Sequence, residues 1–297
     1  CGADVDFVDI DANTYNMIVD VLQKKLQLAE ITNSLPKVVV VVHLTGQSCE
    51  MAKIKQLSDE YGFYVIEDAS HAIGGRYQGA PIGNCRYSDI SIFSFHPVKV
   101  ITTAEGGVAV TNNADLAAKM ELYRSHGITR DSQLMTSEPN GPWDYQQISL
   151  GYNYRMTELQ AALGVSQMDR LDQFVKARHR LAERYDQLFE KLPVTVPWQH
   201  PDSYSGLHLY VIRLQLDQLN VSHLQVFESL REQGIIVNLH YIPVHTQPYY
   251  QALGFKRGDF PEAEQYYAEA ISLPMYSLLT AAQQDTVYSA LVRALQL

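Results

Sequence analysis

The sequence predicts an α/β fold: a large domain built on a mostly parallel sheet with helices on both faces, followed by a small α+β domain. Three observations lead to this prediction. Short Val/Ile-rich runs alternate with amphipathic segments from residue 7 to about residue 125. These runs are almost continuously apolar, as strands buried on both faces are. The chain of 297 residues is also long enough for two domains.

The elements of the large domain follow from their periodicity. Strands are expected in runs rich in Val, Ile and aromatic residues, and helices where apolar residues recur every three or four positions. Asn113 is a suitable N-cap for the last helix, and Gly127 lies at its end. In order, we expect strand 38–44, helix 49–62, strand 63–68, strand 88–95, strand 106–112 and helix 114–127.

The remaining chain changes character twice. Residues 129–150 are polar and contain two prolines, which predicts a long loop, and such loops are usually functional or mobile. Helical spacing then runs from 155 to 192, with a break near 164–171. We expect the domain boundary at residues 170/171, so that the large domain spans 1–170 and the small C-terminal α+β domain spans 171–297. The small domain is expected to contain strand 208–216, helix 222–234, strand 234–242, helix 261–270 and helix 280–295.

Composition excludes several classes of protein. Hydrophobic residues make up 46% and charged residues 19%, as in ordinary globular proteins. A net charge of −10 argues against nucleic acid as a partner. The longest apolar run, 38–44, is far shorter than the ~20 residues of a membrane helix. Three cysteines without paired spacing favour a reducing, cytoplasmic setting, and we predict no metal site.

Two polar groups follow predicted strands of the large domain. Asp68 ends FYVIED, and Lys99 lies just after SIFSF. Ligands of open α/β sheets gather at the carboxyl ends of strands, so both side chains are expected at one cleft. An ordinary ion pair is the alternative. Ser94, which lies close before Lys99, adds a group able to bind phosphate.

Pyridoxal 5′-phosphate (PLP) uses such a set of groups. It needs a lysine for its Schiff base, a carboxylate beside its ring nitrogen and donors for its phosphate. Lys99, Asp68 and Ser94 supply one of each.

Five segments carry a resemblance to a known family. Together they resemble the DegT-type, fold-type I branch of the PLP-dependent nucleotide-sugar aminotransferases. The HPVK-ITTAEGG form is most similar to the transaminases of UDP-4-amino-4,6-dideoxy-N-acetyl-β-L-altrosamine, in pseudaminic acid biosynthesis. The segments are VIEDASHAIGG, SIFSFHPVKVITTAEGGVAVTN, LYRSHGI, GYNYRMTELQAALG and HYIPVHTQPYY.

The resemblance implies roles around the cofactor. Lys99 binds PLP and moves the proton between cofactor and sugar carbon, and Asp68 pairs with the ring nitrogen. His71 lies near the ring or its 3-hydroxyl. Ser94 binds the phosphate, as does Asn153 from the neighbouring subunit of a homodimer with a shared active site. The plainer alternatives are a core histidine for His71 and an N-cap for Asn153.

The resemblance also implies a nucleotide-sugar site formed by Arg155, His240, Tyr241 and His245. A structural salt bridge for Arg155 and half-buried loop positions for the two histidines are the alternatives. The implied reaction uses PLP and its pyridoxamine form (PMP). It moves an amino group from glutamate to the C4 ketone of a UDP-linked 4-keto-6-deoxy sugar.

Two other functions stay open at this stage. Related PLP- or PMP-dependent dehydratases of keto-sugars replace the lysine with histidine, and Lys99 argues against that class. A non-catalytic relative acting as a binding or regulatory protein is the other. The first eleven residues, CGADVDFVDID, predict a turn and a strand of a chain already partway through its fold. We therefore expect the large domain to be truncated at its N-terminus, without the family's first phosphate-binding loop, which favours that last alternative. The intact set of Asp68, Lys99 and Ser94 opposes it.

Overall fold

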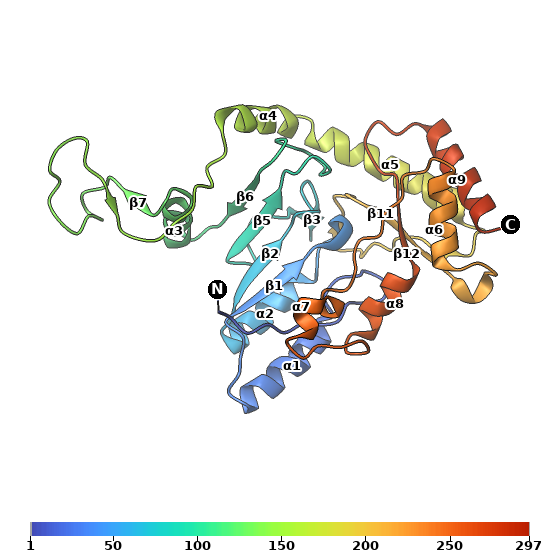
Figure 1. The fold of residues 1–297 in the computed structure, drawn as a ribbon, viewed down its shortest axis with the longest axis horizontal. Coiled ribbons are helices and arrows are strands. Elements are labelled where there is room, and N and C mark those ends of the chain that lie inside the picture. Colours follow the sequence, from blue (N-terminus) through green and yellow to red (C-terminus); the bar gives the residue numbers. More distant parts are fainter. Residues whose placement is uncertain (1, 297) are drawn as a thin grey trace.

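The computed structural model describes residues 2–296 and is built around a four-stranded sheet in the order β1-β2-β5-β6 (Figure 1). β1 (Val38–Val42), β2 (Tyr64–Asp68) and β5 (Ile90–Ser94) are parallel to one another. β6 (Gly107–Val110) is antiparallel to β5. The prediction of a mostly parallel α/β sheet is confirmed.

One face of this sheet packs on two helices, α1 (Val19–Ile31) and α2 (Met51–Tyr61). Every second residue of β1 and β2 is buried against them, as the period of a strand requires. The shared core contains Leu22, Leu26, Val39, Val41, Ile54, Leu57 and Val65. On the opposite face, the alternate β1 residues Val38, Val40 and Val42 are exposed among the described residues.

A second core forms around a three-stranded sheet in the order β12-β11-β9. Its strands are β9 (Val194–Thr195), β11 (Tyr210–Leu214) and β12 (Ala270–Leu273). The helices that contribute to it are α5 (Leu171–Phe189), α6 (His223–Glu232) and α9 (Ala281–Ala294).

Helix α5 connects the two cores (Figure 1). Val175, near its start, packs in a cluster with Ala72 and Phe93 of the first half, whereas Tyr185 and Phe189 lie in the second core. Because α5 packs against residues from both halves of the chain, the domain boundary at residues 170/171 stays a prediction. None of the described helices is both long and apolar enough to cross a membrane.

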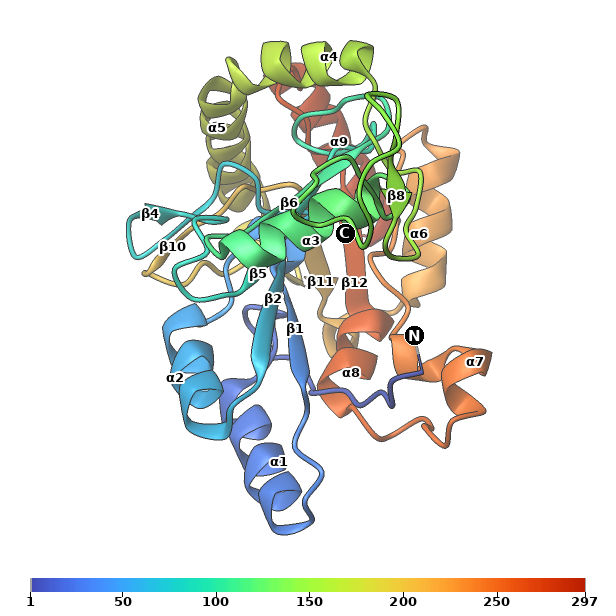
Figure 2. The ribbon, with the colours of Figure 1, turned by 90° about the vertical axis from the view of Figure 1, so that its left-hand side faces the viewer.

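A long arm projects from the body of the molecule (Figures 1 and 2). It starts at α3 (Ala114–Arg124) and returns to α4 (Glu158–Met168). Between the helices, β7 (Ile128–Thr129) and β8 (Gln146–Gln147) form a short antiparallel pair. The rest of this segment is the predicted loop.

Smaller elements complete the chain. A second three-stranded sheet, β10-β3-β4, joins a hairpin after β2 to the segment before β11. The minor elements are β3 (Arg76–Tyr77), β4 (Ala80–Pro81), β10 (Ser203–Tyr204), α7 (Pro248–Gln251), α8 (Pro261–Glu269) and the 3₁₀ turns Leu44–Gly46, Leu216–Gln218 and Val244–Thr246.

Most element predictions are confirmed within a few residues, including the break between α4 and α5. Asn113 caps α3, as its side chain accepts from the amides of Asp115 and Leu116. The strand predicted at 234–242 is wrong: this segment makes only one bridge, Asn238 with Ser272, beside β12. The strand predicted near the start is also absent from the described residues, where only Ile10 bridges Met17. Cys1 lies outside the described residues.

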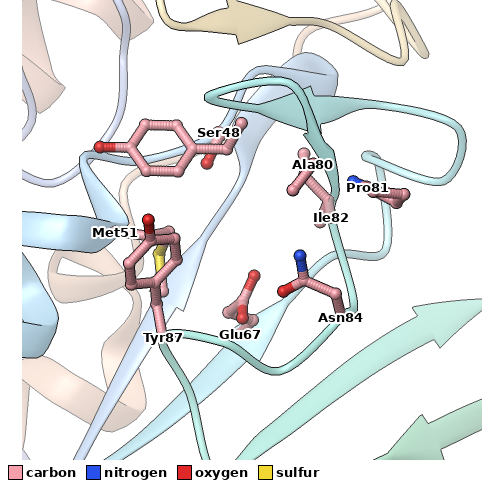
Figure 3. Close-up of a pocket in the computed structure, with 9 residues that line it drawn as sticks. Ser48, Met51, Glu67, Ala80, Pro81, Ile82, Asn84 and Tyr87 are labelled. Carbon is pink, nitrogen blue, oxygen red and sulfur yellow. The ribbon is translucent and has the colours of Figure 1, made fainter.

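A buried carboxylate ties the first half of the sheet together at the carboxyl end of β2. Glu67, 4% exposed, accepts hydrogen bonds from His43 Nε2 (2.9 Å), Ser91 Oγ (3.0 Å) and Ser88 Oγ. Cys49 N–H donates to His43 Nδ1 (3.1 Å), so the ring proton lies on Nε2 and points at Glu67. Figure 3 shows Glu67 beside a small cavity that Met51 and Tyr87 also line.

These hydrogen bonds predict an acid-dependent stability. Burial opposes ionisation of Glu67, but the hydrogen bonds from His43 and the two serines hold its pKa below the ordinary 4.5. The stability that the carboxylate contributes is therefore present above pH 4.5 and is lost as the pH falls through the lowered pKa. We expect Glu67→Gln to flatten the fall of the unfolding free energy on acidification. Urea denaturation at a series of acidic pH values measures this slope.

The exposed Glu138 provides the matched control. Glu138→Gln should leave the slope unchanged. Equal slopes for Glu67→Gln and the unsubstituted protein would contradict the assignment.

Candidate active site

The two strands that carry the predicted acid and serine end at the same edge of the sheet. β2 and β5 run parallel with Asp68 opposite Ile92, and Ser94 lies two residues further along β5. Asp68 and Ser94 are both half-buried. The structure thus brings these two polar groups to the carboxyl edge, where α/β sheets bind their ligands.

Lys99 lies in a tight loop that leaves β5 and returns as β6. The loop is closed by hydrogen bonds from Phe95 N to Gly106 O (2.9 Å) and from Thr103 N to Phe95 O (3.0 Å). Within it, Lys99 N donates to His96 O (2.9 Å). A side chain at Gly106 would clash with Thr103 Oγ1, 2.4 Å from the position of a Cβ. The loop geometry therefore depends on the glycine and fixes the backbone of Lys99.

Asp68 and Lys99 are close enough to interact electrostatically, but they are not an ion pair. No carboxylate of the described residues lies within 4.0 Å of Lys99 Nζ. Asp68 Oδ1 accepts from Ser70 N (3.0 Å), and no described residue donates to Oδ2. Burial lowers the pKa of the Lys99 amine, and the Asp68 charge offsets this in part. The site therefore holds a free carboxylate oxygen and an amine that loses its proton at a lower pH than the amine of an ordinary lysine.

His71 lies deeply buried after β2, in the turn that follows Asp68. Thr45 N–H donates to its Nδ1 (3.3 Å), so its proton lies on Nε2, 3.3 Å from the Tyr241 hydroxyl. Burial, followed by the Lys99 charge, lowers the pKa of His71 to about 3. His71 is consequently a neutral imidazole with a defined tautomer.

The segment around residue 240 brings two further predicted residues to this cluster. Tyr241 contacts His71 through its hydroxyl, and burial together with the Asp68 charge raises its pKa. His240 Nδ1 is 2.8 Å from Ser272 Oγ of β12. Burial and then the Lys99 charge lower the pKa of His240. Both side chains therefore belong to the same electrostatic neighbourhood as Lys99.

Sequence reasoning missed two residues of the cluster, His208 and Thr45. The ring of His208 lies 4.5 Å from that of His71, centroid to centroid, and burial lowers its pKa to about 2. The charge of Lys99 also acts on His208. The only sequence signal was a histidine directly before a strand-like run, LYVIRL, and nothing in that run indicates which cleft it faces.

Three predicted residues lie elsewhere in this chain. Asn153 and Arg155 are exposed on the projecting arm, where Asn153 bridges Ser125 (Figure 1). His245 is buried, with Nε2 2.9 Å from Glu264 Oε1 of α8. His245 thus has a structural partner of its own.

The chemistry of the clustered groups fits PLP. Lys99 offers an amine of lowered pKa to an aldehyde. The free Oδ2 of Asp68 is an acceptor for a protonated ring nitrogen. Ser94 Oγ makes only a 3.5 Å contact with His96 N, so its hydroxyl can donate to a phosphate oxygen.

Comparison with known proteins decides the family. A model of the DegT/DnrJ/EryC1/StrS aminotransferase family matches residues 1–292. The chain belongs to this family. It is therefore a PLP-dependent sugar aminotransferase, and the predicted fold class, enzyme class and cofactor are confirmed.

Two curated relatives illustrate the match. The UDP-4-amino-4,6-dideoxy-N-acetyl-β-L-altrosamine transaminase of Campylobacter jejuni is 37% identical over 98% of this chain and 74% of its own length. The spore coat polysaccharide biosynthesis protein SpsC of Bacillus subtilis is 36% identical over 97% of this chain and 73% of its own length.

Solved structures agree with these relatives. PseC of Helicobacter pylori, an aminotransferase of pseudoaminic acid biosynthesis, is similar with a TM-score of 0.87 at 30% identity. This match covers 99% of the present chain and 74% of PseC. A sugar aminotransferase homologue from Streptococcus pneumoniae, solved in its PLP form, has a TM-score of 0.85 at 27% identity over 99% of this chain and 76% of its own.

The lowered pKa of Lys99 predicts selective labelling. At neutral pH its amine should react with an amine-directed reagent faster than the exposed Lys53, whose pKa is raised by Glu50. Asp68→Asn should lower the midpoint for Lys99 further, because the Asp68 charge raises it. Peptide mass spectrometry after brief labelling across a pH series gives both midpoints. A Lys99 midpoint equal to or above that of Lys53 would contradict the electrostatic description.

Proposed function

We propose that this protein transfers an amino group from glutamate to the C4 ketone of a UDP-linked 4-keto-6-deoxy sugar, in a pathway of the pseudaminic acid type. One observation carries the proposal. The half-buried amine of Lys99, whose pKa is lowered, lies more than 4.0 Å from the Asp68 carboxylate but within its electrostatic influence, and one oxygen of this carboxylate is free. The reaction needs both groups, and the lysine also argues against the related dehydratases.

Lys99 is the proposed catalytic base and acid. Its lowered pKa increases the unprotonated share of the amine at a given pH, and the unprotonated form can take a proton from the substrate carbon and return one. The closed loop between Phe95 and Gly106 limits where Nζ can reach. Such positioning is what makes a single amine effective at both stages.

The neighbouring groups are proposed to hold the cofactor. PLP, when bound, supplies the electron sink of the reaction. Asp68 Oδ2 would keep the ring nitrogen protonated, and the Ser94 hydroxyl would donate to the phosphate. His71 presents its Nε2–H on the same side of the cluster as Tyr241.

The sugar substrate is proposed from the relatives and from the groups of the small domain. The C. jejuni relative and PseC both carry names that place them in such a pathway. His240 and Tyr241 lie beside His71 and Lys99, where a substrate carbon would meet the amine. His245, four residues after Tyr241, is less available to a substrate, because its Nε2 lies 2.9 Å from Glu264 Oε1.

A second copy of the chain is proposed to complete the site. Asn153 and Arg155 lie in the exposed segment between β8 and α4, beside the end of α3. This segment exposes large apolar side chains: Leu150 is 88% and Tyr154 72% exposed. An apolar, aromatic surface of this kind typically marks a protein interface. In a homodimer, Asn153 would reach the partner's cofactor phosphate and Arg155 the nucleotide.

The compartment is proposed to be the cytoplasm. Cys49 and Cys85 are both buried free thiols. Free buried thiols are usual in reducing compartments.

Lys99→Ala should abolish amino transfer while leaving the fold intact, because the half-buried amine has no ion-pair partner to lose. The measurement is amino-sugar formation from glutamate and a UDP-4-keto-6-deoxy sugar. The same protein should absorb in the visible with PLP, and borohydride should fix the cofactor on the peptide that contains Lys99.

Lys55→Ala, at a half-buried lysine paired with Asp59, is the matched control and should retain full activity. Amino transfer by Lys99→Ala would eliminate the mechanism. An unsubstituted protein that stays colourless with PLP would favour the non-catalytic alternative.

Asp68→Asn should slow turnover by about 10²–10⁴-fold, because an amide cannot hold the ring nitrogen protonated. The amide oxygen can still accept from Ser70 N, so the turn should survive. Steady-state rates and the circular dichroism spectrum check both points. Near-normal turnover would show that Asp68 has another role.

A further inference from the structure

His208 is a buried polar residue that the proposed chemistry does not use. Its side chain is 5% exposed, and its ring centroid lies 4.5 Å from that of His71 with the planes 50° apart. Its Nδ1 is fully buried and has no hydrogen-bond partner among the described residues. A buried nitrogen without a partner destabilises a fold, so its presence needs another reason.

The ring of His71 is held on two sides. At its edge, Thr45 N–H donates to Nδ1 (3.3 Å). The ring of His208 packs against it in a tilted arrangement, with the centroids 4.5 Å and the planes 50° apart. The one remaining polar atom, Nε2, points to the Tyr241 hydroxyl at 3.3 Å.

The backbone that carries His208 is fixed by the same turn that binds His71. Thr45 O accepts from His208 N (2.8 Å), so one residue touches both histidines. Thr45 also adopts a positive φ of 61°, a strained conformation that such contacts must hold.

A buried cation also fixes the backbone at His208. Arg178 of α5 is 4% exposed and its Nη1 donates to the carbonyls of Leu207 (3.0 Å), His208 (3.1 Å) and Met275 (2.9 Å). The His208 ring is therefore placed by the second half of the chain against a residue of the first half.

We propose that His208 is a positioning residue, whose ring packs against that of His71 and so keeps this imidazole in one orientation and one tautomer, with Nε2–H directed into the site. The inference rests on the proposed function for the use of that donor. It does not need the cofactor for its test.

The charges around His71 agree with this role. Lys99 and Asp68 face it from the sheet edge, and His240 and Tyr241 from the loop before α7. Asp68 alone favours a proton on His71, and burial together with Lys99 outweighs it. Burial is the larger effect, and the His208 ring supplies part of that burial.

The first test is histidine NMR on the protein without added PLP, with His71 assigned through His71→Gln. The expected spectrum has one tautomer, with the proton on Nε2, and no titration of His71 between about pH 5 and 8. A midpoint inside this range, or exchange between both tautomers, would overturn the proposal.

The second test compares two alanine variants by the same measurement. In His208→Ala the midpoint of His71 should rise by at least about one pH unit, because burial is lost, and both tautomers should be populated. His179→Ala is the matched control, since His179 also stacks on a ring, Tyr204 at 4.1 Å, outside this cluster. It should leave the His71 signals unchanged. A folded His208→Ala with an unchanged His71, or equal shifts in both variants, would overturn the proposal.

His208→Phe separates this role from folding. A phenyl ring can pack against His71 as the imidazole does, and the substitution removes the unpartnered nitrogen. The variant should therefore keep the His71 tautomer and melt at the same or a higher temperature. If His208→Ala does not fold, His208→Phe and the unsubstituted protein still decide the matter. Loss of the single tautomer in a folded His208→Phe would overturn the proposal. Because no measurement depends on turnover, failure of the proposed amino transfer would be seen separately.

Discussion

The buried carboxylate of Glu67 is the group on which the geometry of the site depends. It cannot remain buried without donors, and these come from His43 after β1, Ser88 before β5 and Ser91 within β5. Satisfying one acid therefore ties the carboxyl ends of β1 and β2 to the start of the neighbouring strand β5. Asp68 is the next residue, and side chains alternate along a strand, so fixing Glu67 toward one face directs Asp68 to the other. His43 N also donates to Asp68 O (3.1 Å).

The second half of the site belongs to segments that approach this edge from the small domain. Tyr241 and His208 contact His71, while Gly206 N donates to Gly46 O (2.9 Å) beside them. A side chain at Gly46 would clash with Leu207 N, 2.7 Å from the position of a Cβ. The close approach of two backbones thus sets the distance between the sheet edge and the residues proposed to bind substrate.

Local rules were sufficient to predict Asp68, Lys99 and Ser94, because each follows a run whose strand character is evident and parallel strands end together. They failed for GIIVNLHYI, whose apolar run resembles a strand. The segment is placed instead by single contacts to two elements: Asn238 bridges Ser272 of β12, and Tyr266 Oη of α8 donates to His240 O (2.7 Å). They also missed the helix α1, although its buried Val19, Leu22 and Leu26 recur at helical spacing. The partners of His208 and Glu67 lie far away in sequence, so only the folded chain reveals them.

Burial governs how much positive charge an anionic ligand would meet at this edge of a protein of net charge −10. Burial lowers the pKa of His71, His208 and His240 and that of Lys99, so each of these groups carries less positive charge than it would in water. The dominant fixed charge is then Asp68, which attracts a protonated ring nitrogen. A phosphate that enters the cluster would raise the pKa of the nearest amine or imidazole, because a nearby negative charge favours its protonated form. The same groups can thus lose positive charge through burial and still stabilise an anion, provided that a proton enters with it.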